Sequence, residues 1–147
     1  MVNDGLSPTT GPLLVHSGQR VPLRVVDLGA RGRGVVAERR IEAGELVERA
    51  PVLIIPHEER AAVDPTNVGN YIFLWEPGTT GEDLYRQEGQ AAIALGYVSL
   101  VNHSSRPNCA FTRHFDARVL DLHAIRAIEA GEEITFDYGM TLWFEPA

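Results

Sequence analysis

Short apolar segments separated by turn residues run through most of this chain. Leu23–Leu28, Gly34–Ala37 and Tyr71–Trp75 are rich in the β-branched, aliphatic and aromatic residues that favour strands, and a glycine-rich turn lies between the first two. From Val15 to Phe136, no 12-residue stretch has the 3.6-residue periodicity of an amphipathic helix. Many short strands with regular turns predict a mainly β domain with few short helices.

Two further β segments carry features that predict local geometry. Glu45–Ile55 is rich in strand-forming residues but contains Pro51, which has no N–H to donate, so we expect a sheet edge or a bulge there. Cys109–Phe115 and Arg118–Ile125 flank Asp116-Ala117, which predicts a hairpin with a two-residue turn.

The remaining segments complete the expected order of elements. His57–Val63 is expected to form one short helix, Ala91–Leu95 fits a strand or a helix equally well, and Ile134–Tyr138 is expected to be the last strand. Residues 1–12 have the composition of a flexible leader, and residues 13–147 are expected to form one domain.

One pattern occurs twice in the chain. Ala37-x-Arg39-x-Ile41-Glu42-Ala43-Gly44-Glu45 matches Ala124-x-Arg126-x-Ile128-Glu129-Ala130-Gly131-Glu132 position by position. Each copy is typical of a strand, a turn in which glycine takes a positive φ, and a second strand. Two copies are too few for a solenoid, so we expect two similar hairpins, one near each end of the core.

Composition narrows the classes of function. The 147 residues carry a net charge of −7, which is the wrong sign for a nucleic-acid-binding protein and suits a cationic partner. All 13 basic residues are arginine, so the chain has no lysine of its own. The single cysteine excludes an internal disulfide, no apolar run approaches the 20 residues of a membrane span, and no signal peptide is apparent, so a cytoplasmic location is expected.

Polar residues gather in segments that could carry chemistry. Gly32-Arg33-Gly34 lacks the third glycine and the helix of a dinucleotide-binding motif, and is either a plain tight turn or a backbone that a ligand approaches closely. Asn102–Cys109 is the densest polar cluster and follows an apolar stretch. In Gly131–Gly139, Glu132 and Glu133 are expected to be surface charges at a turn, and Tyr138 is the better catalytic candidate.

In this order, the segments resemble the SET domain, the fold of protein-lysine methyltransferases that use S-adenosylmethionine. The resemblance covers about residues 20–140, and its matching segments are Gly32–Val36, Ile41–Glu45, Tyr71–Phe73, Asn102–Ser104, Pro107–Cys109 and Gly131–Gly139. It implies a β fold with a C-terminal pseudoknot, in which the last strand passes beneath the loop around Asn102. It also implies S-adenosylmethionine as the cofactor and a basic, lysine-containing protein or peptide as the substrate.

The resemblance also assigns roles to individual residues. It makes Tyr138 the catalytic tyrosine and places Tyr71 at the lysine channel, with Phe111 and Phe136 at positions that limit how many methyl groups are added. It assigns the cofactor to the remaining site residues, which are Gly32, Arg33, Gly34, Asn102 and His103. Phenylalanine at both channel positions favours di- or trimethylation.

The sequence departs from the family pattern in ways that affect the site. Ser105 replaces a cysteine that many members use in a zinc site, and no cysteine-rich extension follows, so no metal is expected. Ser99-Leu100-Val101 replaces an arginine-aromatic pair that many members place before Asn102. In the aromatic tail, residues 140–147, Trp143 is expected to cover the cofactor; packing on the core or in a dimer interface is the alternative.

Two other functions fit parts of the sequence. A non-catalytic SET-fold interaction module would need none of the residues assigned to catalysis, yet all of them are present. A zinc hydrolase built on His103, His114 and His123 lacks a recognisable ligand spacing and a general base. The leading hypothesis is therefore a single-domain lysine methyltransferase with no nucleic-acid or membrane partner, and a homodimer is expected from the apolar tail and the β-rich segment Val47–Ile55.

Overall fold

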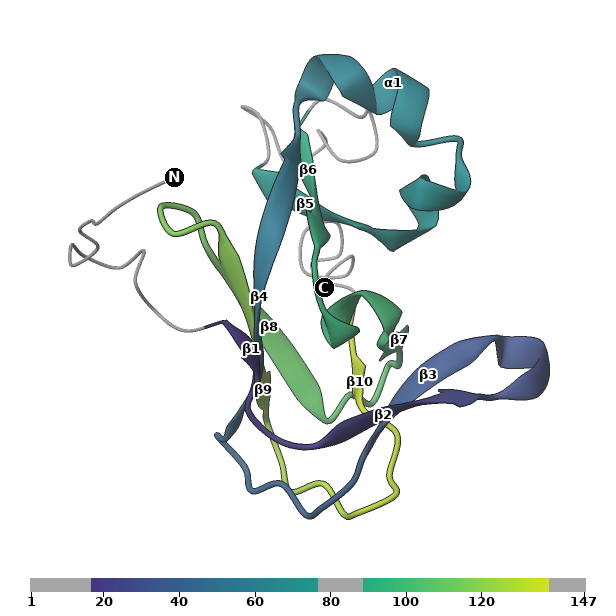
Figure 1. Cartoon of the computed structure of the whole chain (residues 1–147), viewed down its shortest axis with the longest axis vertical. Coiled ribbons are helices and arrows are strands. Elements are labelled where there is room, and N and C mark those ends of the chain that lie inside the picture. Colours follow the sequence, from purple (N-terminus) through teal and green to yellow (C-terminus); the bar gives the residue numbers. More distant parts are fainter. Residues whose placement is uncertain (1–16, 77–88, 138–147) are drawn as a thin grey trace, which may run out of the picture.

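The computed structural model describes residues 17–76 and 89–137, and it is built mainly of strands. Figure 1 shows their arrangement around the long strand β4. The strands are β1 (Gly18–Gln19), β2 (Leu23–Asp27), β3 (Arg33–Ala37), β4 (Leu46–Ile55), β5 (Ile72–Glu76), β6 (Gln90–Ala94), β7 (Asn102–His103), β8 (Cys109–His114), β9 (Val119–Ala124) and β10 (Thr135–Phe136). The helices are α1 (Arg60–Val63) and the 3-10 helices η2 (Gly29–Arg31), η3 (His57–Glu59), η4 (Asn67–Tyr71) and η5 (Tyr97–Leu100).

The predicted mainly β class is confirmed, and most predicted elements are present. Segment 91–95, which was ambiguous, forms β6, and the predicted helix over 57–63 is a 3-10 turn that continues into α1. Within the described part of the last predicted strand, only Thr135–Phe136 pairs as a strand. No helix in the described ranges is long and apolar enough to span a membrane.

Strand β4 is central, which corrects the expectation for Pro51. The large sheet has the order β5-β6-β4-β9-β8-β10-β7, with β1 on β4 and with β2 and β3 in a sheet of their own. Along one edge, β4 pairs with β9 from Leu46 as far as Pro51, which lies opposite Val119. Along its other edge, β1 pairs as far as Arg49 and β6 begins at Val52. Pro51 therefore lies where one neighbour has ended and the next has not begun, so its missing N–H breaks no ladder.

The hairpin of β8 and β9 was predicted correctly in its strands and incorrectly in its turn. His114 pairs with Val119, so residues 115–118 form a four-residue connection. The N–H of Arg118 donates to the carbonyl oxygen of His114 at 2.8 Å, and Arg118 has a φ of 57°. A two-residue hairpin turn of type I′ or II′ would require positive φ at Asp116 at least. Among the described non-glycine residues only Arg118 has a positive φ, and the chain reverses through it instead.

The two copies of the repeated pattern pair with each other. Ile41 and Ile128 form an antiparallel bridge, with backbone N–H to carbonyl distances of 2.8 and 2.9 Å in the two directions. The N–H of Gly44 donates to Ala124, and the N–H of Gly131 donates to Ala37, at the equivalent positions of the repeat. Both glycines have φ close to 88°. The expected hairpins are therefore not formed, since β3 does not pair with β4 and β9 does not pair with β10. The two copies are instead similar turns that pair with each other about an approximate twofold axis.

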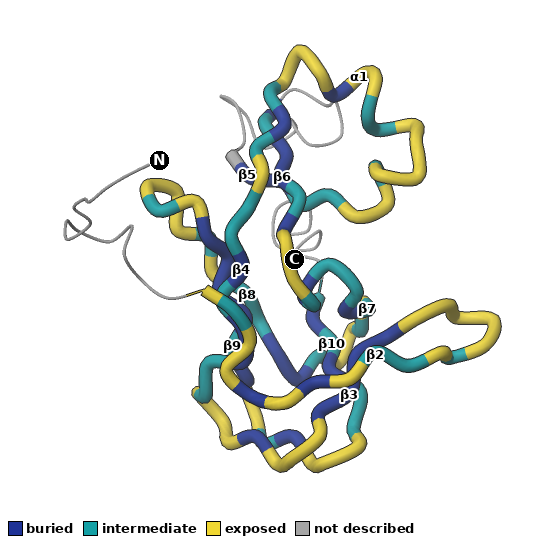
Figure 2. Tube along the Cα trace, viewed as in Figure 1, coloured by how far each residue is buried: buried dark blue, intermediate teal, exposed yellow. Residues whose placement is uncertain are grey.

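The short strand β10 joins segments that are far apart in the sequence. It pairs in parallel with β7 (Thr135 with Asn102, Phe136 with His103) and with β8 (Phe136 with Cys109). β10 thus lies between two strands that the loop over residues 104–108 connects, and this is the threaded arrangement that the resemblance implies. Figure 2 shows that buried residues run through β4, β9 and β10, whereas the hairpin tips are exposed.

Candidate functional site

A pocket of about 160 Å³ lies where the β2–β3 turn, the end of η4 and the η5–β7 segment meet. Its lining brings together residues from three distant parts of the chain: Arg31, Gly32, Arg33, Asn70, Tyr71, Ser99, Leu100, Val101 and Asn102. Of the residues that the sequence assigned to the cofactor, Gly32, Arg33 and Asn102 meet here. Tyr71, assigned to the lysine channel, lines the same pocket and is 42% exposed.

Asn102 is held by two acceptors on one side. Its Nδ2 donates to the carbonyl oxygen of Arg33 at 3.0 Å and to Oε2 of Glu133 at 2.9 Å. A carbonyl and a carboxylate oxygen can only accept, so the NH₂ group must be the part of the amide that faces them. In the described part of the chain, no group donates to Oδ1 of Asn102, which leaves this acceptor for the pocket.

Glu133 is a residue of the site that the sequence analysis misplaced on the surface. Its side chain is only 19% exposed, and its second oxygen, Oε1, accepts a 2.8 Å hydrogen bond from Arg31. Val36 pairs with Glu133 in a bridge, which sets Glu133 beside β3. The partners of Glu133 are 31 and 102 positions away in the sequence, so no local pattern could identify the role of this carboxylate.

The glycines of the β2–β3 turn serve different purposes. Gly34 is buried against the site, since a Cβ there would lie 2.6 Å from Leu28 Cδ1, 2.8 Å from Glu133 Oε2 and 3.0 Å from Asn102 Nδ2. Gly32 has a φ of 82° and open space on the side where a Cβ would project. Gly34 therefore lets side chains pack against the backbone, and Gly32 supplies the turn and an open backbone surface beside the pocket.

His103 and the predicted channel phenylalanines differ in their exposure. His103 is exposed, and its Nδ1 is 3.9 Å from Oδ1 of Asp137. Phe73, Phe111 and Phe136 form a mutual cluster with ring centroids 5.3–5.9 Å apart. Phe136 is 1% exposed and belongs to the core, whereas Phe73 and Phe111 are partly buried against it. Tyr138 and Trp143 lie outside the described residues.

Glu48 is a buried carboxylate behind the pocket. The sequence analysis assigned no role to it, nor to Phe73. The carboxylate of Glu48 is 3% exposed and accepts hydrogen bonds from the N–H groups of Tyr97 (2.9 Å) and Val98 (2.8 Å). Burial raises the pKa of Glu48, and these two hydrogen bonds partly oppose that increase. Because η5 leads into Asn102, Glu48 anchors one wall of the pocket.

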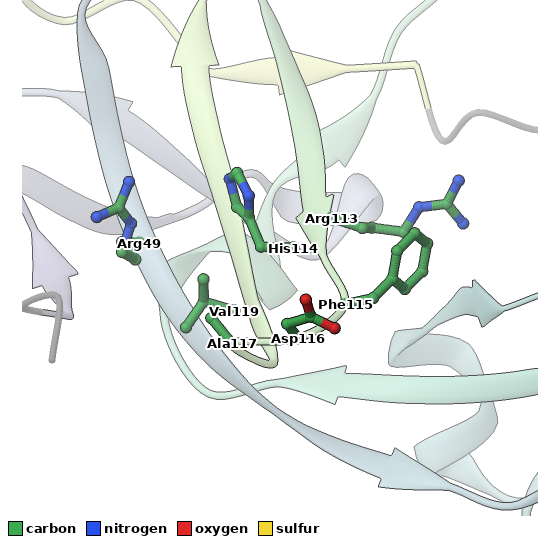
Figure 3. A pocket seen from close by; sticks show the side chains of 7 residues that line it. All are labelled: Arg49, Arg113, His114, Phe115, Asp116, Ala117 and Val119. Carbon is green, nitrogen blue, oxygen red and sulfur yellow. The ribbon is translucent and has the colours of Figure 1, made fainter. Parts of the chain in front are cut away.

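A larger pocket of about 530 Å³ lies at the tip of the β8–β9 hairpin. Arg49 makes a bidentate pair with Asp121 at 2.6 and 2.7 Å, and Nε2 of His114 lies 3.0 Å from the same carboxylate. Burial opposes ionisation of Asp121, but the hydrogen bonds and charges of Arg49 and His114 outweigh it and lower the pKa. Figure 3 shows Arg113 pointing away from Arg49, so the cations of this pocket do not converge on one ligand.

The candidate metal ligands do not form a cluster. Within the two described ranges, no three histidine, cysteine or acidic side chains come together as a metal site would require. His114 and His123 lie on different strands, β8 and β9. Cys109 is buried, and this burial raises the pKa of its thiol to about 12, so the thiol stays protonated.

Comparison with known proteins agrees with this architecture. The family model of the SET domain matches residues 32–139. A histone-lysine N-methyltransferase of Schizosaccharomyces pombe, specific for lysine 37 of histone H3, is 32% identical over 86% of this chain and 79% of its own length. The N-lysine methyltransferase KMT5A of Xenopus tropicalis is 30% identical over 86% of this chain and 38% of its own.

A solved structure adds a match in three dimensions. The Neurospora SET domain protein DIM-5, a histone lysine methyltransferase, superposes with a TM-score of 0.60 and 28% identity, covering 82% of this chain and 53% of that one. The fold and the pocket thus define a SET domain. The chain belongs to the SET-domain family of lysine methyltransferases.

Proposed function

We propose that this protein transfers a methyl group from S-adenosylmethionine to the side-chain amine of a lysine in a basic protein. The observation that carries the proposal is the convergence of Arg31–Arg33, Tyr71 and Asn102 on one pocket in a SET fold. The relatives named above are lysine methyltransferases, two of them acting on histones by name. Histones are basic, and the net charge of −7 on this chain favours such a partner.

The residues of the pocket fit one end of the cofactor. S-adenosylmethionine has an amino-acid end with an ammonium and a carboxylate group. The open acceptor Oδ1 of Asn102 suits the ammonium, and the guanidinium of Arg31 suits the carboxylate. Gly32 leaves backbone accessible beside them. Asn102, Arg31 and the turn over residues 32–34 would therefore hold the cofactor.

The chemistry needs alignment and a neutral amine more than covalent help. When bound, the cofactor would supply an electrophilic methyl carbon; transfer of this methyl group to the lysine nitrogen would break the carbon–sulfur bond and leave its electron pair on sulfur. The lysine must first lose its proton, and its ordinary pKa of about 10.4 falls in an apolar channel beside a cationic sulfonium. Phe73 and Phe111, which are partly buried and pack on the core residue Phe136, are proposed to supply apolar walls of this kind.

Tyr138 and Tyr71 are proposed to orient the amine. A neutral tyrosine hydroxyl accepts a hydrogen bond from the amine without the negative charge that would stabilise the ammonium form. Tyr71 lines the pocket at the end of η4, and Tyr138 follows Asp137 directly in the sequence. Trp143 is proposed to cover the cofactor, and Phe111 and Phe136 favour addition of two or three methyl groups.

The test separates cofactor binding from catalysis. Calorimetry should show that the wild type binds S-adenosylmethionine, that Asn102→Ala loses this binding, and that Tyr138→Phe keeps it. With a basic lysine-bearing protein, mass spectrometry should show methyl-lysine with the wild type and none with Tyr138→Phe. Since the chain has no lysine, any methyl-lysine comes from the added substrate. A wild type that binds no cofactor would instead favour the interaction module.

A further inference from the structure

The carboxylate of Glu133 bonds two polar side chains that line the pocket, Asn102 and Arg31. Its Oε2 accepts from Asn102 Nδ2 at 2.9 Å, and its Oε1 accepts from Arg31 at 2.8 Å. The Glu133 side chain is 19% exposed, whereas that of Arg31 is 58% exposed and lines the pocket. One carboxylate therefore reaches both an amide inside the site and a guanidinium at its rim.

We infer that Glu133 is a positioning residue that sets Asn102 and Arg31 to bind the ammonium and the carboxylate of the cofactor's amino-acid end. The inference rests on the proposed function and names the groups that bind this end of the ligand. Glu133 itself faces the protein side of Asn102, and it does not line the pocket.

The orientation of the Asn102 amide follows from acceptor chemistry. If Oδ1 faced Glu133, it would meet both a carboxylate oxygen and the carbonyl oxygen of Arg33, and the NH₂ group would lose both partners. Ionised Glu133 therefore keeps Nδ2 on its own side and Oδ1 toward the pocket. An amide oxygen held in this way accepts from an ammonium group without rearranging first.

Arg31 is oriented by the same carboxylate. Only its Nη2 atom donates to Glu133, which leaves further N–H donors of the planar guanidinium for an anion. The sequence has Ser99-Leu100-Val101 where many family members have an arginine and an aromatic residue before the asparagine. Arg31 lines the same pocket from the β2–β3 turn, so it provides a cation there from another segment.

The packing around Gly34 holds Glu133 close to Asn102. Gly34 admits Glu133 and Asn102 at distances that no side chain at position 34 would allow. The bridge between Val36 and Glu133, with the N–H of Ile134 donating to Val35 at 2.8 Å, fixes the backbone of Glu133 against β3. The carboxylate therefore has little freedom to leave its two partners.

The experiment compares ligands with and without the amino-acid end. S-adenosylmethionine and 5′-methylthioadenosine, which lacks that end, are titrated by calorimetry into the wild type, Glu133→Gln and the control Glu132→Gln. Glu132 is the adjacent carboxylate, but its side chain accepts from Arg126, from Asn108 and from the N–H of Glu129 instead. We expect Glu133→Gln to weaken S-adenosylmethionine binding about tenfold, the size of a lost hydrogen bond to a charged group, and to leave 5′-methylthioadenosine binding and the control's affinities unchanged.

A second variant tests whether Arg31 binds the carboxylate of the cofactor. It also keeps the inference testable if Glu133→Gln does not fold. Arg31→Met should weaken binding of S-adenosylmethionine but not of its decarboxylated form, which keeps the ammonium. Arg24→Met is the matched control, because Arg24 is 59% exposed and pairs with Glu38 on the same hairpin.

The outcomes separate this inference from the function beneath it. Equal weakening of ligands with and without the amino-acid end, or no weakening, would overturn the role of Glu133 while leaving the methyltransferase proposal intact. A wild type that binds neither S-adenosylmethionine nor 5′-methylthioadenosine would overturn the proposed function and this inference with it.

Discussion

Replacing Gly34 with alanine tests whether the packing around Asn102 sets cofactor affinity. The new Cβ would lie 2.6 Å from Leu28 Cδ1, 2.8 Å from Glu133 Oε2 and 3.0 Å from Asn102 Nδ2. Real Cβ contacts are longer, so all three side chains must move. Gly34 does not have a positive φ, so the cost is steric alone.

The magnitude follows from overpacking a tight site. Extra methyl groups in packed surroundings cost about 1–3 kcal/mol. For a chain of 147 residues, the unfolding entropy is about 0.3 kcal/mol/K, so each 1 kcal/mol lowers Tm by about 3 °C. Gly34→Ala should therefore lower Tm by about 3–9 °C. Because Asn102 and Glu133 are displaced together, S-adenosylmethionine affinity should fall about tenfold or more.

Gly29→Ala is the matched control. Gly29 has a φ of 70°, and a Cβ added there would meet nothing within 4 Å, so alanine is strained by backbone conformation alone. That strain costs about 1–2 kcal/mol, or about 3–6 °C in Tm, and cofactor affinity should stay within about twofold of the wild type, because Gly29 does not line the pocket. Thermal unfolding and calorimetry measure both quantities. Unchanged affinity in Gly34→Ala would show that Asn102 is not positioned by this packing.

Three further variants or treatments probe the fold around the site. Asp121→Asn should destabilise the protein by about 2–4 kcal/mol at pH 7, because the partly buried Arg49 loses its carboxylate; the pKa of Asp121 is lowered from 3.8, so in urea unfolding this penalty should shrink as pH falls below about 4. The pKa of Glu48 is raised above 4.5 by burial, so its contribution to stability is present below that pH and lost as pH rises through the folded-state pKa; the stability of the wild type relative to Glu48→Gln should fall over that rise, and a parallel pair of pH profiles would contradict this. Cys109 is buried with its pKa raised to about 12, so iodoacetamide should modify it only under unfolding conditions, which mass spectrometry detects.

Local patterns were enough to predict most of the longer strands, because β-branched and aromatic residues in short runs favour extended backbone wherever they pair. The two-residue strands β1 and β7 were not predicted. Tyr71–Trp75 and the flanks of the β8–β9 hairpin were found in this way. The pattern failed at Pro51, since an edge position and a gap between two neighbouring strands both spare the missing N–H. Only the topology distinguishes these two cases.

The residues of the site show the same difference. Some can be recognised from the local sequence, and others depend on partners far away in the chain. Asn102 and Gly32–Gly34 stand in recognisable motifs, and the structure brings them together. Glu133 and Glu48 depend on partners 31 to 102 positions away. A buried, bonded carboxylate and a solvated one have the same local sequence signal, so only the fold could reveal either role.

The short strand β10 explains how these distant residues become one site. Its parallel pairing with β7 places Thr135 beside Asn102, two positions after Glu133. Immediately before it, the N–H of Ile134 bonds Val35, so the same segment is tied to β3 beside Gly34. Glu133 is thereby held between the strand that carries Asn102 and the turn that carries Arg31. Because β10 pairs with β7 and β8 at once, we expect the cofactor pocket to form only when all three strands have paired.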